Sequence, residues 1–293
     1  MRCASFSSTD DGETWSAPGV AVRNSSNPGA GLLADVRDVR LKEYIDRYWI
    51  AIDDSTGTLY ITSVQTWLTP GVTSPRIGPI VSSHDGGRTW SDSSLAAPVG
   101  SPHLGAAFGT VAVAYEDAGC SCVVFARSGD DGRTFVRRNL RFDTDASPQV
   151  VADPTREGRF AVMTLVGTRL QSRTTNDFGR TWSAPTVISQ GGTATRFKPW
   201  ISYSRGGVLG AGWRNGYPGG SYDFWAAASL DGGVTWQKAR RLSTVRSLPQ
   251  TPIWVGGDDT SDVQFGPDDT LYASWGDWRT GDLDIFWAGF PTR

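Results

Sequence analysis

Arginine, carboxylate and aromatic residues follow several strand-like apolar runs of this 293-residue chain. Arg214 directly follows the run that ends at Trp213, and Arg279 follows Trp278 shortly after the run that ends at Trp275. Tyr217 and Tyr222 follow Arg214 closely. A guanidinium group binds a carboxylate through two parallel hydrogen bonds. A phenol beside a carboxyl group can act as a nucleophile or move a proton. These residue types favour recognition of an acidic sugar, whose ring an aromatic face could hold.

One short pattern occurs five times and must help to position these residues. Each copy has a hydroxyl residue, Asp two positions later, Gly two further, Thr two further and then an aromatic ring. We call the copies aspartate turns, and they occupy residues 8–15, 83–90, 128–135, 175–182 and 229–236. Their carboxylates belong to Asp10, Asp85, Asp130, Asp177 and Asp231.

The residues of the aspartate turn are those that stabilise a tight turn. A carboxylate can accept hydrogen bonds from backbone N–H groups a few residues later, and the glycine can adopt the positive φ that closes such a turn. These glycines are Gly12, Gly87, Gly132, Gly179 and Gly233. We therefore expect all five carboxylates to stabilise turns, not to bind a ligand.

The spacing of the aspartate turns indicates a repeat architecture. Successive turn carboxylates are 75, 45, 47 and 54 residues apart. A period of 20 to 50 residues is typical of repeat folds, and three of these four steps match about one four-stranded propeller blade. The first step is longer by roughly half a blade.

The aspartate turn resembles the Asp box, or bacterial neuraminidase repeat, of the sialidase-like superfamily, and the copies span nearly the whole chain. The resemblance implies a β-propeller in which each turn joins the third strand (c) of a blade to its fourth strand (d). The ligand face is then built from the opposite b–c and d–a connections. Asp boxes also occur in polysaccharide lyases and non-catalytic propellers, so the fold does not settle the activity.

The resemblance also implies site residues. Sialidases place three arginines on the substrate carboxylate and use a Tyr nucleophile assisted by Glu. By position in the blades, the counterparts are Arg169, Arg214 and Arg279 for the carboxylate, with Tyr217 or Tyr222 as the phenol and Glu116 as its partner. Further substrate contacts are expected from Trp67, Arg76 and Asp277.

Two sequence features depart from this assignment. The family's Arg-Ile-Pro run ahead of the first Asp box is absent, and the nearest similar run, Arg76-Ile77-Gly78-Pro79, lies nine positions before Asp85 in the second repeat. The segment that begins at Trp278 also reads as a polar turn with an internal ion pair, which would make Arg279 structural.

Aligning the repeats on the aspartate turns predicts a single all-β domain over residues 1–293. Short β-branched and aromatic runs alternate with Gly, Pro and Asp, as expected of strands. The register begins at strand c of the first blade and ends after strand c of the last. A six-bladed propeller of four-stranded antiparallel blades with an incomplete first blade is therefore expected, and a five-bladed ring is the alternative.

Composition excludes several classes. The formal net charge of -2 gives no footprint for nucleic acid or an anionic membrane, and no apolar run is long enough for a membrane-spanning helix. No metal or cofactor is expected, because Cys120 and Cys122 lack the further ligands of a zinc site. Their spacing would strain a disulfide, so we expect packed thiols.

The cellular location and the oligomeric state do not follow from the sequence. No signal peptide is visible after Met1. Because the register opens in mid-blade, the missing strands and an export signal would lie upstream, as in a secreted or cell-surface protein.

Three functions compete. The first is a glycoside hydrolase that acts on acidic or decorated glycans. The second is a non-catalytic propeller that binds a glycan or a protein through the same face. The third is a polysaccharide lyase, which would release an unsaturated sugar that absorbs in the near ultraviolet.

Overall fold

The computed structural model describes residues 2–23, 42–68, 78–92, 94–97, 102–117, 119–145, 148–189, 194–249 and 261–293. Throughout these residues the regular structure is β-sheet, and no helix occurs in them. Arg76, which was predicted to contact substrate, lies outside the described residues, and nothing is described of the side chain of Trp67 within β4.

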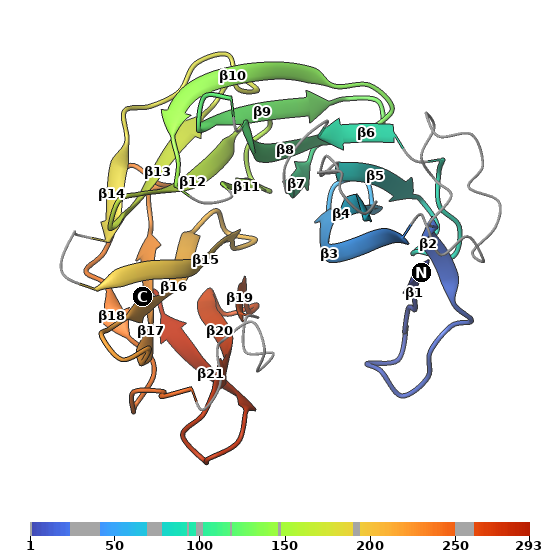
Figure 1. Ribbon diagram of the computed structural model, residues 1–293. Coiled ribbons are helices and arrows are strands. Elements are labelled where there is room, and N and C mark those ends of the chain that lie inside the picture. The colour runs from blue at the N-terminus through green and yellow to red at the C-terminus, as the bar shows by residue number, and fades with distance from the viewer. Residues whose placement is uncertain are drawn as a thin grey trace. The chain divides into compact units, whose positions relative to one another are not determined.

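The strands form six antiparallel sheets, and strands that are consecutive in the chain are neighbours in each sheet (Figure 1). The first sheet pairs β1 (Arg2–Ser5) with β2 (Gly19–Arg23). The second contains β3 (Lys42–Asp53), β4 (Thr58–Leu68), β5 (Gly78–Ser83) and β6 (Ser94–Ala97). The third contains β7 (His103–Ala107), β8 (Thr110–Asp117), β9 (Cys122–Ser128) and β10 (Val136–Asp143).

The remaining sheets follow the same plan. The fourth contains β11 (Gln149–Ala152), β12 (Phe160–Val166), β13 (Arg169–Thr175) and β14 (Thr186–Ser189). The fifth contains β15 (Thr195–Tyr203), β16 (Leu209–Gly216), β17 (Tyr222–Ser229) and β18 (Arg240–Arg241). The sixth has three strands, β19 (Ser261–Phe265), β20 (Thr270–Asp277) and β21 (Asp284–Pro291).

This series of meandering sheets confirms the prediction of an all-β propeller fold. Five sheets of three or four strands have the size of a blade, which matches the five-bladed alternative and not the expected six-bladed ring with an incomplete first blade. The sheet of β1 and β2 holds the two strands that were predicted for an incomplete first unit.

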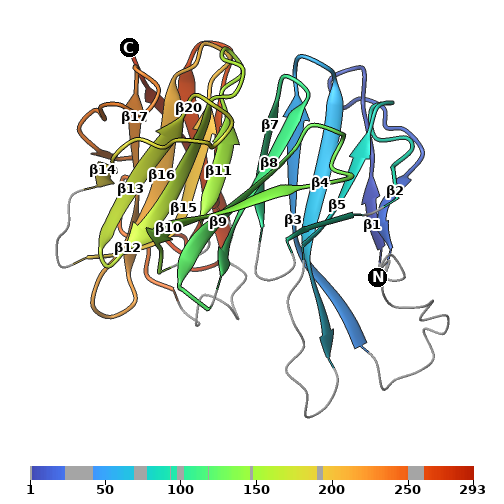
Figure 2. The same cartoon turned by 90° about the horizontal axis from the view of Figure 1, so that it is seen from above.

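By its internal contacts the chain divides into two compact units, Met1–Val150 and Val151–Arg293. In the first unit, β3, β4 and β5 lie side by side (Figure 2). Each unit is described by itself below, and the prediction of a single domain stays a prediction.

Each aspartate turn joins the third described strand of its sheet to the fourth, or β1 to β2, as predicted. In the turn after β17, the Asp231 carboxylate accepts hydrogen bonds from the Ser229 hydroxyl at 2.7 Å and from the backbone N–H of Thr235 at 2.9 Å. The Thr235 hydroxyl also donates to it, at 2.6 Å. The same three bonds recur at Asp10, Asp85, Asp130 and Asp177.

These bonds stabilise the ionised carboxylates. In the first four turns, hydrogen bonds from the neighbouring hydroxyl and backbone groups lower the Asp pKa from 3.8 to about 2. At Asp231 partial burial opposes ionisation, but the hydrogen bonds from Thr235 and Ser229 still lower the pKa to about 2. All five carboxylates are therefore charged at neutral pH.

The turn glycine is required by backbone conformation. Gly233 has φ +102, a conformation that L side chains rarely adopt. A Cβ at this position would also lie 2.8 Å from Thr174 Cγ2 of the preceding sheet. The positive φ recurs at the four equivalent glycines, Gly12, Gly87, Gly132 and Gly179, as the pattern predicts.

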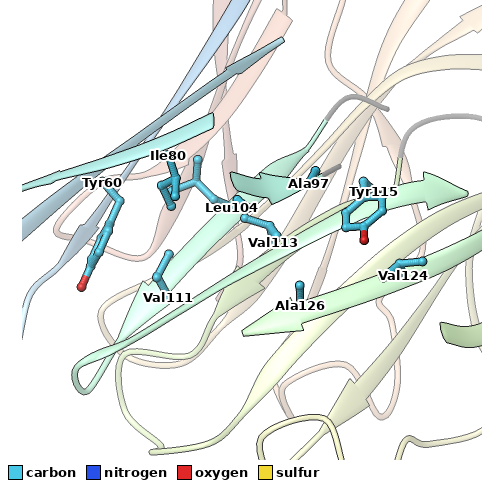
Figure 3. Packing of buried hydrophobic residues seen from close by; sticks show 10 residues of the cluster. Tyr60, Ile80, Ala97, Leu104, Val111, Val113, Tyr115, Val124 and Ala126 are labelled. Carbon is cyan, nitrogen blue, oxygen red and sulfur yellow. The ribbon is translucent and has the colours of Figure 1, made fainter. Parts of the chain in front are cut away.

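The core of the first unit lies between neighbouring sheets. Tyr60 and Ile80 of the β3–β6 sheet pack with Val111, Val113 and other side chains of the β7–β10 sheet (Figure 3). These side chains are buried, and Val111 and Val113 are 0% exposed. The alternation of side chains along a strand explains the arrangement, because Val111, Val113 and Tyr115 share one face of β8.

The second unit repeats this arrangement with larger rings. Phe224 of β17 stacks on Trp275 of β20, with ring centroids 4.9 Å apart and planes at 13°. On the other face of the β15–β18 sheet, Trp213 packs against Met163 and Leu170 of the preceding sheet. Tryptophans that are additional to the aspartate turns therefore help to pack one sheet on the next.

The expectation of free thiols at Cys120 and Cys122 is wrong, because the two residues form a disulfide. Their Cα atoms are 5.1 Å apart, within the range that a disulfide spans. The β8–β9 turn brings the two side chains together, since Ser121 between them has a positive φ of 46. No helix in the described part of the chain could span a membrane.

Candidate functional site

The candidate site lies at the end of the second unit opposite its aspartate turns, where β16 leads into β17 and β20 into β21. The sequence places Arg214 and Asp277 in these connections, but both strands extend further than expected. β16 continues to Gly216 and β20 to Asp277, so the two residues lie within the sheets. Their neighbours on paired strands, Phe224 opposite Arg214 and Asp284 opposite Asp277, account for the extension.

Arg214 is a buried cation with aromatic neighbours. Its side chain is 0% exposed, and Cζ lies 4.6 Å from the ring centroid of Tyr222 and 6.0 Å from that of Phe197. The Tyr222 hydroxyl donates a 2.6 Å hydrogen bond to the Gly276 carbonyl on β20. The structure therefore brings Arg214 and Tyr222 together, but it uses the Tyr222 phenol to join two sheets.

Arg279 forms an ion pair, but with Asp277 at the end of β20 and not within the turn at 278–282, where the sequence suggested one. Arg279 Nη2 donates to Asp277 Oδ2 at 2.6 Å, and Trp275 Nε1 donates to the same oxygen at 3.0 Å. Burial of Asp277 opposes ionisation, but the hydrogen bonds from Arg279 and Trp275 hold its pKa below the usual range. Arg279 Nη1 also donates to Thr244 Oγ1 at 3.0 Å, and Cζ lies 4.1 Å from the Phe286 ring centroid.

Tyr217 lies beside a group of charges that sequence reasoning missed. Arg246 Cζ is 3.7 Å from the Tyr217 ring centroid, and Arg246 Nη2 is 3.7 Å from Asp223 Oδ2. Arg241 Nη2 reaches the other oxygen of Asp223 at 2.8 Å. The Asp223 side chain is 2% exposed, whereas that of Arg246 is 50% exposed, so the carboxylate is covered while one of its cations faces solvent.

Backbone pairing explains how Arg241 and Arg246 reach this end. After β18 the chain continues along β17, where Leu242 N–H donates to the Phe224 carbonyl, and Tyr222 and Ser247 exchange backbone hydrogen bonds. The segment from β18 to Ser247 therefore runs beside β17 towards Tyr222. The only signal in the sequence is three arginines within seven residues, at 240, 241 and 246.

We call Arg214, Arg241, Arg246 and Arg279, together with Asp223 and Asp277, the arginine cluster. Arg214 and Asp223 face opposite sides of the β16–β17 pair, because Phe224 lies opposite Arg214 and Asn215 opposite Asp223. Arg279 bonds to Thr244, on the segment that carries Arg241 and Arg246. The six residues therefore lie at one end of the sheet but on both of its faces. These six residues carry a formal charge of +2, and Asp284, which pairs in register with Asp277, reduces the local charge to +1, in a chain whose net charge is -2. Such an excess attracts anions.

Two other predicted site residues lie on other strands. Glu116 is half-buried near the end of β8 in the first unit. Arg169 begins β13 in the second unit, where it is exposed and pairs in register with Val166. Within the described residues, no group of His, Cys, Asp and Glu could hold a metal ion.

Comparisons with known proteins show that solved structures, sialidases among them, have a similar β-propeller fold. No family model matches the chain, and neither does any curated protein. Among solved structures, the microbial sialidase Hz136 from a Hadza source is similar at 19% identity and a TM-score of 0.55, over 97% of this chain and 58% of that one. The chain thus spans less than two thirds of that protein.

In two further solved structures, this chain matches a larger share of the other chain. An intramolecular trans-sialidase of Ruminococcus gnavus, in complex with oseltamivir carboxylate, matches at 12% identity and a TM-score of 0.57, over 97% of this chain and 86% of that chain. A protein of unknown function from Dyadobacter fermentans matches at 15% identity and a TM-score of 0.58, over 86% and 80%. At these identities the likeness establishes a shared propeller fold and no activity.

Proposed function

We propose that this chain is a sialidase-like carbohydrate-active protein that binds an acidic glycan at the arginine cluster and hydrolyses a glycosidic bond there. The observation that carries the proposal is the local excess of positive charge beside a half-exposed tyrosine, on a propeller fold that sialidases share. Arg246 is the best placed ligand for a carboxylate, because its side chain is half-exposed and borders Tyr217. Arg279 is more covered and already pairs with Asp277.

Tyr217 is the preferred nucleophile of the two candidate phenols. It is partly exposed in the connection between β16 and β17, whereas Tyr222 is 1% exposed and donates its hydroxyl to Gly276. In this proposal Arg214 acts as a positioning residue, whose buried guanidinium packs on Tyr222 beneath the site. Glu116 stays the proposed partner of the phenol, and Arg169, Arg76 and Trp67 stay proposed substrate contacts.

Binding without turnover is the second candidate function. It is favoured by the burial of Arg214, the bonded hydroxyl of Tyr222 and the Asp277–Arg279 pair, since these residues hold the fold together and are not open to a substrate. A lyase has no comparable observation in its favour.

A titration and turnover experiment separates these functions. The protein would be titrated with 3′-sialyllactose, hexuronate oligosaccharides and neutral oligosaccharides, and Arg246→Gln should weaken binding of the acidic ones about tenfold. Arg180→Gln, which removes an exposed cation from the aspartate turn at 175–182, is the control and should bind like the parent.

Tyr217→Phe then distinguishes enzyme from binder. In a hydrolase the variant should lose release of free sugar and retain binding, because only a hydroxyl is removed. Affinity with no product from the parent would support the binding function. A product that absorbs in the near ultraviolet would identify a lyase, and equal affinity of Arg246→Gln for every acidic sugar would refute the proposed site.

A further inference from the structure

The second unit contains a cavity of about 530 Å³ between the β11–β14 and β15–β18 sheets. Residues 187–189 of β14 form one wall, side chains of β16 and β17 form another, and residues 236–239 ahead of β18 border it. This volume falls within the range of small-molecule sites. Both sheets belong to one compact unit, so the cavity does not depend on how the two units are placed.

Three indole rings line the cavity. Trp213 and Trp225 are paired across β16 and β17, so their side chains share one face of the sheet. Trp236 is the last residue of the aspartate turn at 229–236. Trp213 N–H donates to Asn215 Oδ1 and Trp236 N–H to Ser172 Oγ, each at 3.0 Å. The indole N–H of Trp225 is buried and has no hydrogen-bond partner among the described residues. The Trp225 ring packs against the hydrophobic cluster that contains Trp213.

The polar lining is positively charged. Arg196 and Lys238 line the cavity, and no acidic residue does so among its described lining residues. Arg196 Nε donates to Ser189 Oγ at 3.0 Å, and Nη1 donates to the Ala194 carbonyl, so neutral acceptors orient the guanidinium group. Burial lowers the pKa of Arg196, and Tyr217 partly offsets this effect. A bound anion would compensate the Arg196 guanidinium for the hydration that it loses on burial.

We propose that this cavity is a second saccharide-binding site, which takes a sugar residue that carries a carboxylate or sulfate group. One face of the sugar packs on the half-exposed rings of Trp225 or Trp236, because aromatic rings offer a large rigid apolar surface. The anionic group lies against Arg196 and Lys238, where charge-assisted hydrogen bonds form. No residue of the arginine cluster lines the cavity, but the cavity borders that cluster, because Asn215 and Trp225 pair in register with Asp223 and Arg241.

The test uses the full chain with ¹⁵N-labelled tryptophan and follows the indole N–H signals by NMR. Trp225→Phe identifies the Trp225 signal by its loss. The probes are a hexuronate trisaccharide, a sulfated disaccharide and a neutral trisaccharide, which separate carboxylate from sulfate and both from an uncharged ring. At least one anionic probe should shift the Trp225 signal in a saturable way, and the neutral probe should not.

Charge variants locate the binding by calorimetry. Lys238→Gln and Arg196→Gln should each weaken binding of the anionic probe about tenfold. Lys238 is exposed, so its replacement leaves the core intact, and Arg180→Gln is the matched control. A tenfold loss of affinity at the Trp225 signal in Lys238→Gln, with parental affinity at that signal in Arg180→Gln, supports the second site.

Three outcomes would overturn the proposal. They are a Trp225 signal that no probe shifts, unchanged affinity in both Lys238→Gln and Arg196→Gln, and equal binding of the neutral probe. Loss of binding in Arg246→Gln with parental binding in Lys238→Gln would place the sugar at the arginine cluster alone. That last result refutes the second site and leaves the proposed function standing.

Discussion

At the scale of single residues, the two candidate phenols differ in what surrounds them. Tyr222 is enclosed between Arg214 and the backbone of β20, whereas Tyr217 borders the half-exposed Arg246. The difference follows from their positions, because Tyr222 begins β17 and Tyr217 lies in the connection before it. Removal of the Tyr222 hydroxyl should therefore lower stability, and removal of the Tyr217 hydroxyl should lower turnover.

Tyr222→Phe should lower the free energy of unfolding by about 1 kcal/mol or more, because the buried Gly276 carbonyl loses its hydrogen-bond donor. Binding and turnover per folded molecule should stay at the parental level. Urea titration followed by tryptophan fluorescence measures the first quantity, and Tyr217→Phe, with little loss of stability, is the matched variant. Unchanged stability of Tyr222→Phe would show that the bond to Gly276 contributes nothing.

The Asp277–Arg279 pair allows a double-mutant cycle. Arg279→Ala should lower the free energy of unfolding by about 3 kcal/mol, because it leaves the 0% exposed Asp277 carboxylate without its cation. Asp277→Asn combined with Arg279→Ala should be more stable than Arg279→Ala alone. Additive effects of the two substitutions, measured by urea titration, would mean that the pair has no coupling energy.

At the scale of elements, the strands and turns were predictable from sequence, and the site was predictable only in part. The aspartate turns carry local information, since each hydrogen bond of the motif joins residues within four positions of one another. The extent of β16 depends instead on partners from other strands, Phe197 on one side of Arg214 and Phe224 on the other. The local sequence pattern of β16 carries no information about these partners on other strands.

The same reason explains why Asp223, Arg241 and Arg246 were missed. Their meeting depends on the path of the chain beyond β18, which is fixed by hydrogen bonds from Leu242 and Ser247 to β17. Conversely, Arg214 was expected at the ligand face because it follows a strand-like run, whereas the structure buries it within that strand. A sequence predicts that a strand exists more reliably than it predicts the residue at which the strand ends.

The aspartate turn gives a prediction for an element. Asp231→Ala should lower the free energy of unfolding by about 1 to 2 kcal/mol, because the turn loses the acceptor of its local hydrogen bonds. Glycan binding per folded molecule should not change. Asp282→Ala, which removes an exposed carboxylate from the connection between β20 and β21, is the control and should leave stability near the parental value. Lost affinity at parental stability would mean that the turn belongs to a ligand site.

At the scale of the whole molecule, the five aspartate turns make the free energy of unfolding depend on pH in the acidic range. Each carboxylate has a pKa of about 2 in the folded protein, against 3.8 as the ordinary value. Between these values the unfolded chain binds more protons than the folded one, so stability falls as pH falls. Above about pH 4 this contribution is fully present.

The thermal midpoint should therefore decrease steadily from pH 4 to pH 2, and the contributions of the five turns should accumulate. Circular dichroism at a β-sheet wavelength, recorded over a series of buffers of equal ionic strength, measures the change. Asp231→Ala should show a shallower decrease than the parent, because one of the five groups is absent. A midpoint that is constant over this range would contradict the assignment of the turns as acid-sensitive.

The compactness of each aspartate turn also bears on the order of folding. The hydrogen bonds of its Ser229 and Asp231 side chains close loops of at most four residues, and the backbone bond from Gln237 N–H to the Ala228 carbonyl closes one of nine. Closing loops this short costs little chain entropy, so the turn can form before distant strands meet. We expect the turns to be formed in the transition state, where they set the register of the two strands that they join. Loss of the Asp231 carboxylate should then slow refolding more than it speeds unfolding.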